Sequence, residues 1–474
     1  MKTKKYFYSK ITFLLTALLM TTVACERELS DDVVEATFPT TADIFIDGPI
    51  GMGTDFYFPF IGEPSNPIGS KLNAWSVDDN VAYLGTSSMR FDVPNADDPE
   101  GNYAGAAFII DGGGRDLSGY DALTFWIKAT QGTHIGEIGF GEGETTVLRK
   151  NISVSTGWNK VIIPIPDPSK LTQEKGMLRY ATGGIDGLGY TFWIDELKFE
   201  KLGTLTNQSP FIQGGEDAEG VAFSGQKLDI SNLGLTATLE NGSEVSVSAS
   251  PNYFEFTSSN PGVASVNLTE VTLDQAGQST ITATLAGVQA AGSLSVTSID
   301  LAPTPNLATA NVISVFSDAY TNSPVDYFNG YWAPWQTTEG QDDINVNGNN
   351  IIKYTELNFV GIEFQGDKII DASSMTHFHV DIYLENPLKS GDFVIVKLQD
   401  LGTDSVFGGG NDRAGELRLT STTTPALVNG GWISVDVPFS RFPGLSTRAN
   451  LAQIVFDTQA TVQSIFVDNI YFHN

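Results

Sequence analysis

The sequence contains very little of several residue types, and each scarcity excludes a class of protein. Cysteine occurs once, at Cys25, so the chain cannot close an internal disulfide. There are 4 histidines and 26 basic residues against 56 acidic residues, which gives a formal net charge of −30. Such a field repels nucleic acid and disfavours sulfated or uronate-rich polymers, because no run of Lys or Arg overrides it. Acidity also keeps a surface protein soluble, so it excludes polyanions without choosing a ligand.

Long apolar runs are also missing, and the only candidate lies near the N-terminus. It covers residues 11–20, follows several lysines and is followed by the sequence TTVAC at residues 21–25. A membrane-spanning helix needs 18 or more apolar residues, so this run is too short. Its position before a lone cysteine resembles the lipobox of bacterial lipoproteins, which implies a signal peptide at residues 1–24 and lipidation of Cys25. The alternative is a plain anchor or a cleaved secretory signal.

The residues that follow the cysteine form a short acidic tether at 25–40 in this interpretation. They begin with the sequence ERELSDD, which looks like the tag that sends Bacteroidota-type lipoproteins to the outer face of the outer membrane. The resemblance implies an outer-membrane, cell-surface-exposed protein. It would contact the membrane only through its lipid anchor.

The remaining chain has the pattern of β-strands nearly throughout. Short runs rich in Val, Ile, Thr, Phe and Tyr alternate with polar residues and are separated by Gly, Asn, Asp and Pro. Helical periodicity is almost absent. A length of 474 residues, at roughly 150 residues per domain, predicts about three domains.

An internal repeat organises these strands, because residues 41–201 recur at 303–474. The Gly-Trp pair at 157–158 returns at 431–432, with proline six residues after each tryptophan. The closing strands at 192–197 and 465–470 each place an aspartate at the fourth position. The second copy also contains an insertion with the glycine-rich sequence FGGGNDR at 407–413, which predicts a flexible loop.

Two all-strand copies that close on this motif resemble the β-jelly-roll carbohydrate-binding modules. Between them, residues 256–266 and 277–283 resemble a group 2 bacterial Ig-like domain. These resemblances imply an all-β fold in which two β-jelly-roll (β-sandwich) modules, at 41–201 and 303–474, flank an Ig-like β-sandwich at 202–302. The whole layout resembles the surface glycan-binding lipoproteins of Bacteroidota polysaccharide-utilisation systems, which work beside an outer-membrane glycan transporter complex.

A neutral sugar is bound by exposed aromatic rings that are flanked by carboxylate, amide or guanidinium groups. Residues 327–335 read YFNGYWAPW, and their glycine and proline mark a loop rather than a strand. Several rings in one loop cannot all enter a core. We therefore predict sugar contacts by Trp332, Trp335 and Tyr331. The alternative is that the tryptophans plug the end of the sandwich.

Strand alternation predicts a second set of sugar-binding rings. Trp126 shares a strand face with Lys128, and Trp193 shares a face with Asp195, so both rings lie on polar faces. This arrangement fits an open concave sheet on which sugars stack. A second layer covering that sheet would fit equally well.

Repeated acids near the first and last strands of both copies are candidate ligands for a structural Ca²⁺. The resembled modules often hold such an ion there through hard oxygen ligands. The candidate ligands are Asp47, Asp195, Asp318 and Asp468. The alternative is turn chemistry, in which aspartate accepts hydrogen bonds from nearby backbone amides.

The sequence predicts a protein that captures a neutral polysaccharide for uptake and catalyses nothing. A β-1,3-glucan such as laminarin is the first guess, and it rests on the resemblance. One rival is a glycoside hydrolase or its accessory subunit, which needs two positioned carboxylates. The Glu-x-Asp-x-x-Glu strand of family-16 hydrolases is absent, and Glu142 and Glu144 lie among glycines that would hold them poorly. The other rival is a surface adhesin that binds protein or cell wall.

Overall fold

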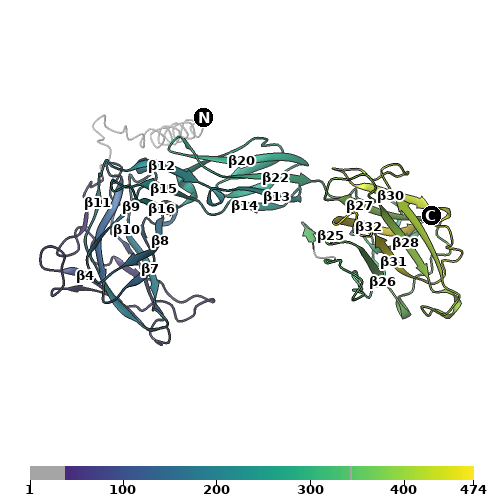
Figure 1. Cartoon of the computed structure of the whole chain (residues 1–474), viewed down its shortest axis with the longest axis horizontal. Coiled ribbons are helices and arrows are strands. Elements are labelled where there is room, and N and C mark those ends of the chain that lie inside the picture. Colours follow the sequence, from purple (N-terminus) through teal and green to yellow (C-terminus); the bar gives the residue numbers. More distant parts are fainter. Residues whose placement is uncertain (1–37, 342–343) are drawn as a thin grey trace, which may run out of the picture.

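A computed structural model describes residues 38–341 and 344–474, and Figure 1 shows them as three all-β parts that form an arch. The described residues contain β-strands and short 3₁₀ helices but no α-helix. None of the described helices is long and apolar enough to cross a membrane. The predicted signal peptide, the lipidation site Cys25 and most of the predicted tether fall outside the described residues.

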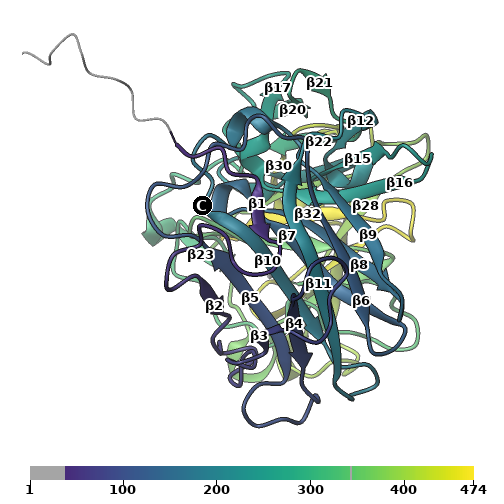
Figure 2. The same cartoon turned by 90° about the vertical axis from the view of Figure 1, so that its left-hand side faces the viewer.

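The N-terminal module is a sandwich of two antiparallel sheets. Its first sheet has the order β3-β4-β11-β6-β9, with β1 also pairing β11. Its second sheet begins with the order β2-β5-β10-β7-β8, and Figure 2 shows these strands from the N-terminal side of the arch. Between the two sheets, the buried rings of Phe91 and Phe192 stack with their centroids 4.6 Å apart. The strands of the first sheet are β1 (Asp43–Phe45), β3 (Trp75–Asp78), β4 (Ser88–Val93), β6 (Ala122–Ala129), β9 (Asn159–Pro164) and β11 (Tyr190–Glu200). Those of the second sheet are β2 (Tyr57–Pro59), β5 (Tyr103–Ile109), β7 (Thr133–Phe140), β8 (Val147–Val154) and β10 (Gly176–Gly183).

The second sheet does not end at β8 but continues into the middle domain through β16 (Glu244–Ala249), β15 (Gly234–Thr238) and β12 (Thr206–Phe211). Ser248 pairs with Leu148 across this boundary. The hydroxyl of Tyr253 also donates to the carbonyl of Thr145, 2.9 Å away. The free edge of β8 is thereby paired. The sheet thus crosses the domain boundary that was predicted at residue 202.

The rest of the middle domain consists of two further sheets with the orders β13-β22-β20-β17 and β14-β19-β18. The pair β13–β22 is parallel, whereas the others are antiparallel. The strands are β13 (Asp217–Phe223), β14 (Lys227–Asp229), β17 (Phe254–Ser258), β18 (Ala264–Asn267), β19 (Glu270–Leu273), β20 (Gly277–Leu285), β21 (Val288–Gln289) and β22 (Ser293–Ile299). The all-β sandwich fold predicted from sequence is confirmed, while the Ig-like assignment of this domain stays a prediction.

The C-terminal module repeats the strand order of the N-terminal one, except that no strand of its second sheet corresponds to β2. Its first sheet has the order β24-β25-β32-β27-β30, with β23 also pairing β32. Its second sheet has the order β26-β31-β28-β29. The repeat extends to the backbone, because the closing strands bulge at Glu196 and at Asn469 with positive φ angles of 51° and 52°. The strands are β23 (Val312–Phe316), β24 (Ile344–Val346), β25 (Asn349–Tyr354), β26 (Phe359–Glu363), β27 (His377–Leu384), β28 (Val394–Asp400), β29 (Arg413–Leu419), β30 (Ile433–Pro438), β31 (Leu451–Asp457) and β32 (Ile465–His473).

The outer face of the first C-terminal sheet packs against the tip of the middle domain. Phe223 at the end of β13 contacts the ring of Phe466, with centroids 5.0 Å apart. The indole of Trp432 donates to the carbonyl of Asp300, 2.7 Å away. These residues belong to a buried apolar cluster that also contains Ile299 and Tyr383. Apolar burial therefore holds this junction, in contrast to the backbone pairing at the other one.

We expect Phe223→Ala to loosen the junction between the middle domain and the C-terminal module without unfolding either part. Truncating a buried Phe costs on the order of 3–5 kcal/mol, and here that cost falls on contacts between the two parts. Limited proteolysis should then cut faster between residues 300 and 306, and small-angle scattering should report a broader range of arch shapes. Val221→Ala, on the exposed part of the same strand, is the matched control. Equal cleavage rates in both variants would contradict the assignment.

Candidate functional site

The aromatic loop (residues 327–335) lies against β26 of the C-terminal module. The ring of Trp332 rests on Gly361, where an added Cβ would lie 2.5 Å from the indole. The indole N–H donates to a carboxylate oxygen of Glu363, 2.6 Å away, and the ring stacks near Phe359 with centroids 5.8 Å apart. Glycine at position 361 is therefore what allows the indole to approach the sheet this closely.

Polar side chains at the end of the loop hold it in one shape. The buried side chain of Gln336 accepts from the backbone N–H of Trp332 and donates to Asn329. Asn329 donates in turn to the carbonyl of Gly340, 2.9 Å away. Asn358 donates to the carbonyl of Trp335, 2.8 Å away. A loop held by such bonds keeps its rings in position before a ligand arrives.

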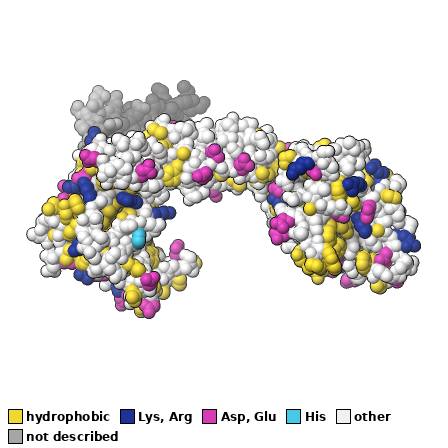
Figure 3. All heavy atoms as spheres, in the orientation of Figure 1, with side chains coloured by type: hydrophobic (Ala, Val, Ile, Leu, Met, Phe, Trp, Pro, Cys, Tyr) yellow, Lys and Arg dark blue, Asp and Glu magenta, His cyan; other side chains and the backbone are white. Residues whose placement is uncertain are grey.

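Three rings of the aromatic loop project into solvent. Trp335 is 73% exposed, Tyr327 is 62% exposed and Tyr331 is 60% exposed. Trp335 and Tyr331 thus do not plug the sandwich, whereas Trp332 is half-buried against β26. Figure 3 shows hydrophobic side chains gathered on this side of the C-terminal module, where Figure 1 places β26. Exposed rings that gather on one loop are typical of an interaction site.

Amide side chains lie beside these rings on the outer face of the second C-terminal sheet. In the register of the sheet, Glu363 lies opposite Gln453, and Gln453 lies opposite Gln399. Their neighbours along each strand, such as Ile362, Ile454 and Leu398, point into the core. Gln399 and Gln453 are only 7% and 8% exposed, and no hydrogen bond of their side chains occurs among the described residues. Two nearly buried amides without partners are suited to bind a ligand's hydroxyl groups.

Glu363 completes this row and is already engaged by protein groups. One carboxylate oxygen accepts from Trp332 and the other accepts from the amide of Gln365, 3.0 Å away. Burial raises the pKa of Glu363, and these two hydrogen bonds partly oppose that rise. The carboxylate therefore positions the indole ring. We call the outer face formed by Gly361, Glu363, Gln399 and Gln453, together with the aromatic loop, the sheet-and-loop site.

The predicted rings of the N-terminal module lie together on the outer face of its first sheet. Trp193 lies opposite Arg90 and Lys128, whose charged groups sit 5.9 and 5.7 Å from its ring centroid. Its indole N–H donates to Asp78, 2.9 Å away, and it is 8% exposed. The side chains of Arg90 and Lys128 thus lie over the ring of Trp193, so this ring does not face open solvent.

Trp126 is covered in a similar way by an aromatic ring. The ring of Tyr83 stacks on it at 3.9 Å, and Trp158 lies 6.0 Å from Tyr83. The loop that carries Tyr83 is held by Asp195, which accepts from the backbone N–H groups of Tyr83 and Leu84. Trp126 and Trp193 share one face, as predicted. That face corresponds to the covered sheet of the C-terminal module, so the two predicted sets of rings occupy non-equivalent surfaces.

Sequence reasoning missed the amides Gln399 and Gln453, the carboxylate of Glu363, and the rings Tyr83 and Trp158. Trp158 carried a usable signal, because its Gly-Trp pair recurs at 431–432. The amides carried none, since a strand places alternate residues outward without revealing which outer face remains open.

The four candidate calcium ligands do not form a closed set of carboxylates. No group of three or more His, Cys, Asp or Glu positioned to hold a metal occurs within residues 38–341 and 344–474. In the N-terminal copy, Asp47 accepts from the backbone N–H groups of Thr86 and Ser87, and Asp195 accepts from three backbone N–H groups. Four of these five amides lie 39 to 112 residues away in the sequence, so the bonds hold distant loops and are not the local turns of the alternative. Calcium at Asp47 and Asp195 stays a prediction.

The C-terminal copy differs, because Asp468 is buried like Asp195 but incompletely bonded. Its Oδ2 atom, like the Oδ1 atom of Asp381, is buried without a hydrogen-bond partner among the described residues. Burial raises the pKa of Asp468 to about 7, and the nearby charges of Asp318 and Asp381 add to the rise. Unpaired buried carboxylate oxygens fit a hard cation such as Ca²⁺. Calcium at Asp318 and Asp468 therefore stays a prediction.

Residues 54–201 match the family model described as carbohydrate binding domain 30. No curated protein matches the chain. Carbohydrate recognition is thus supported for the N-terminal module by a family of binding modules.

Several solved structures share low similarity with the chain. One is a family 30 carbohydrate-binding module, 21% identical, which covers 34% of this chain and 98% of its own with a TM-score of 0.26. Another is the family 30 module of a cellulosomal cellulase from Clostridium thermocellum, 20% identical, with coverages of 34% and 97% and a TM-score of 0.25. A β-1,2-glucanase from Parabacteroides distasonis is 13% identical, with coverages of 56% and 40% and a TM-score of 0.23.

We expect Gly361→Ala to displace Trp332 from β26. The added methyl group would overlap the indole, and overpacking of this kind costs about 1–3 kcal/mol. Tryptophan fluorescence should shift to longer wavelength as the ring enters water, with a lower thermal midpoint. Gly119→Ala is the control, because its Cβ would meet open space. An unchanged spectrum in Gly361→Ala would show that the loop does not depend on this contact.

The variant Asp468→Asn should show whether Asp468 is a buried charge that destabilises the fold or a ligand for calcium. A folded-state pKa of about 7 lies above the ordinary value of 3.8, so the ionised form opposes folding increasingly as the pH rises from about 4 to 7. In chelator at pH 8, Asp468→Asn should therefore be more stable than the wild type, by at most about 4 kcal/mol. The gain should vanish near pH 4. Denaturant unfolding at several pH values measures it.

If Asp468 binds Ca²⁺, added calcium should raise the midpoint of the wild type but not that of Asp468→Asn. A wild-type midpoint that calcium leaves unchanged would remove the calcium prediction for this copy.

Proposed function

We propose that the protein captures a neutral polysaccharide at the cell surface without cleaving it, and that the sheet-and-loop site is the main binding site. One observation carries the proposal. The indole of Trp332, fixed by Glu363, packs on the sheet at Gly361 near the unpaired amides of Gln399 and Gln453, and the same loop carries exposed rings. Aromatic rings take the C–H faces of a sugar, and amides take pairs of its hydroxyl groups.

The polymer is a β-glucan, with β-1,3-glucan (laminarin) as the first choice, and it is neutral because the chain carries a net charge of −30. Support for the class of ligand comes from the family match of residues 54–201. The choice of laminarin rests on the resemblance to surface glycan-binding lipoproteins. An anchor at Cys25 and delivery to an outer-membrane transporter complex follow from the same resemblance.

Binding without cleavage is supported by how the carboxylate of the site is used. Both oxygens of Glu363 accept hydrogen bonds from protein groups, so this carboxylate is committed to positioning Trp332. Glycoside hydrolysis needs one carboxyl group free to donate a proton and a second carboxylate across the bond.

Affinity should be modest for one module and higher for a polymer. A ring contact contributes on the order of 1 kcal/mol beyond burial, and each neutral hydrogen bond contributes about 0.5–1.5 kcal/mol. If the N-terminal module holds the same strand, its binding becomes intramolecular and avidity follows. The paired strands β8 and β16 keep that module at a fixed place relative to the middle domain.

The test is native affinity electrophoresis of the soluble chain, residues 26–474, in gels that contain laminarin, mixed-linkage glucan, mannan, xylan or alginate. We expect retardation by a neutral glucan, none by alginate, and no release of reducing sugar. Trp335→Ala should weaken binding about fivefold through loss of a stacking ring. Gln399→Ala combined with Gln453→Ala should weaken it by tenfold or more.

Leu268→Ala, an exposed apolar position in the middle domain, is the control and should bind as the wild type does. Release of reducing sugar would show that the protein hydrolyses the glycan and would contradict the proposal of binding without cleavage. Absence of retardation by every glycan would favour an adhesin that binds protein or cell wall. Equal retardation of wild type and both site variants would move the binding site away from the sheet-and-loop site.

A further inference from the structure

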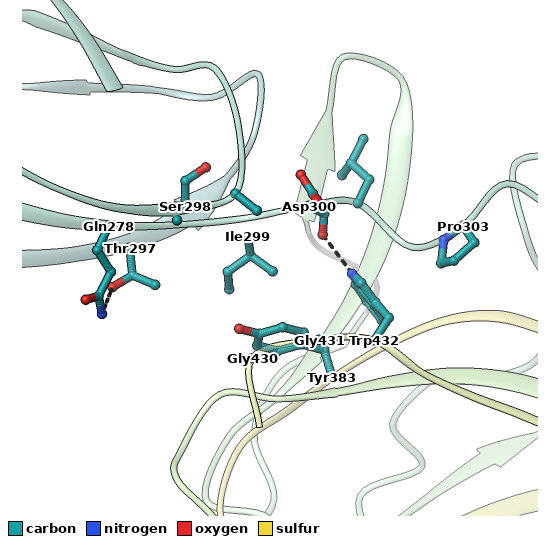
Figure 4. A pocket seen from close by; sticks show the side chains of 13 residues that line it. Gln278, Thr297, Ser298, Ile299, Asp300, Pro303, Tyr383, Gly430, Gly431 and Trp432 are labelled. Carbon is teal, nitrogen blue, oxygen red and sulfur yellow. Dashed lines mark hydrogen bonds between the residues drawn. The ribbon is translucent and has the colours of Figure 1, made fainter. Parts of the chain in front are cut away.

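A cavity of about 480 Å³ opens at the junction between the middle domain and the C-terminal module (Figure 4). The middle domain contributes Gln278 and Thr297 and the following linker contributes Asp300, whereas the C-terminal module contributes Tyr383 and Trp432. Small-molecule sites usually measure 300–1,000 Å³ and are found preferentially at domain interfaces. The cavity lies on the first C-terminal sheet, so it is separate from the sheet-and-loop site on the second sheet.

Two aromatic rings form one wall of this cavity. The rings of Tyr383 and Trp432 have centroids 5.8 Å apart and meet at 60°. The hydrogen bond from Trp432 to the carbonyl of Asp300 fixes the indole, and Phe223 stacks near it at 6.5 Å. The rings are therefore held in place before anything binds, which lowers the entropic cost of binding.

The opposite wall carries several polar side chains and no positive charge. Figure 4 shows Gln278 and Thr297 on the middle-domain side, to the side of the Tyr383 ring and across the space from its hydroxyl. The bond between Gln278 and Thr297 is 3.5 Å long, at the limit of a hydrogen bond, and the Tyr383 hydroxyl has no hydrogen bond among the described residues. None of the lining residues is Lys, Arg or His. An anionic ligand would find no cation here, whereas a neutral polyhydroxy ligand would find both rings and hydrogen-bonding groups.

We propose that the junction cavity binds a sugar ring of the neutral glycan, stacked on Trp432 and hydrogen-bonded by Gln278, Asp300 and the Tyr383 hydroxyl. The inference rests on the proposed function for the class of ligand. A sugar in this place contacts two domains at once, so it stiffens the junction. The N-terminal copy lacks such a cavity wall, because Lys128 occupies the place of Tyr383 beside Trp158.

The test uses the soluble chain, residues 26–474, with its 7 tryptophans replaced by 5-fluorotryptophan. The fluorine resonance of Trp432 is assigned by its loss in Trp432→Phe. Laminaritetraose and cellotetraose are titrated into the wild type, into Gln399→Ala/Gln453→Ala, and into Gln278→Ala/Tyr383→Phe. The last pair removes polar groups but keeps the aromatic packing. Gln275→Ala, an exposed glutamine outside the cavity, is the matched control.

We expect one tetraose to shift the Trp432 resonance in the wild type, in Gln275→Ala and in the sheet-and-loop variant alike. The midpoint of that shift should rise roughly fivefold in Gln278→Ala/Tyr383→Phe. The same tetraose should slow proteolysis between residues 300 and 306. A Trp432 resonance that neither tetraose moves overturns the inference, even where laminarin retards the wild type in gels. An equal midpoint in Gln278→Ala/Tyr383→Phe also overturns it. The proposed function is tested by the affinity gels and fails only if no glycan retards the wild type there.

Discussion

Each β-sandwich buries one face of each sheet and leaves two outer faces. Which of these outer faces is covered by another part of the chain determines how the domains are joined and which surface stays open. In the C-terminal module, the middle domain takes part of one outer face through Phe223 and Ile299. The other outer face keeps its amides unpaired and its rings in solvent. In the N-terminal module, charged and aromatic side chains of the module itself cover the first face, and its second sheet is extended by the middle domain. The outer face of the second C-terminal sheet is thus the surface that no other described part of the chain has covered.

The two copies show how one fold gives different surfaces from the same framework. The bulge after Asp195 and Asp468 is common to both, as is the Gly-Trp pair that precedes β9 and β30. On that framework, Trp193 of the first copy is replaced by Phe466, which is small enough to receive Phe223 from the middle domain. Trp158 and Trp193 lie beside Lys128 in the first copy. Their counterparts in the second copy, Trp432 and Phe466, are part of the apolar junction with the middle domain.

The linkage between the parts follows from two different physical forces. Backbone pairing joins β8 to β16 and gives a continuous sheet, which resists bending within its plane. Apolar burial with one indole hydrogen bond joins the middle domain to the C-terminal module, and this kind of contact yields more easily. In the proposed function, a glycan on the C-terminal module would therefore be presented from the more adjustable end of the arch.

The sequence by itself determined the all-β fold, because strand periodicity and turn residues are local properties that every segment reports. It also determined the repeat and the aromatic loop, since glycine and proline there prevent a strand from hiding the rings of Tyr331 and Trp335. Tertiary structure alone decided which faces stayed open. The roles of Gln399, Gln453 and Glu363 depend on strand register and on the loop that lies over Gly361. The side chains that cover Trp126 and Trp193 come from segments that are distant in the sequence. Alternation places a side chain on a face, but only the packing of other elements decides whether that face meets water.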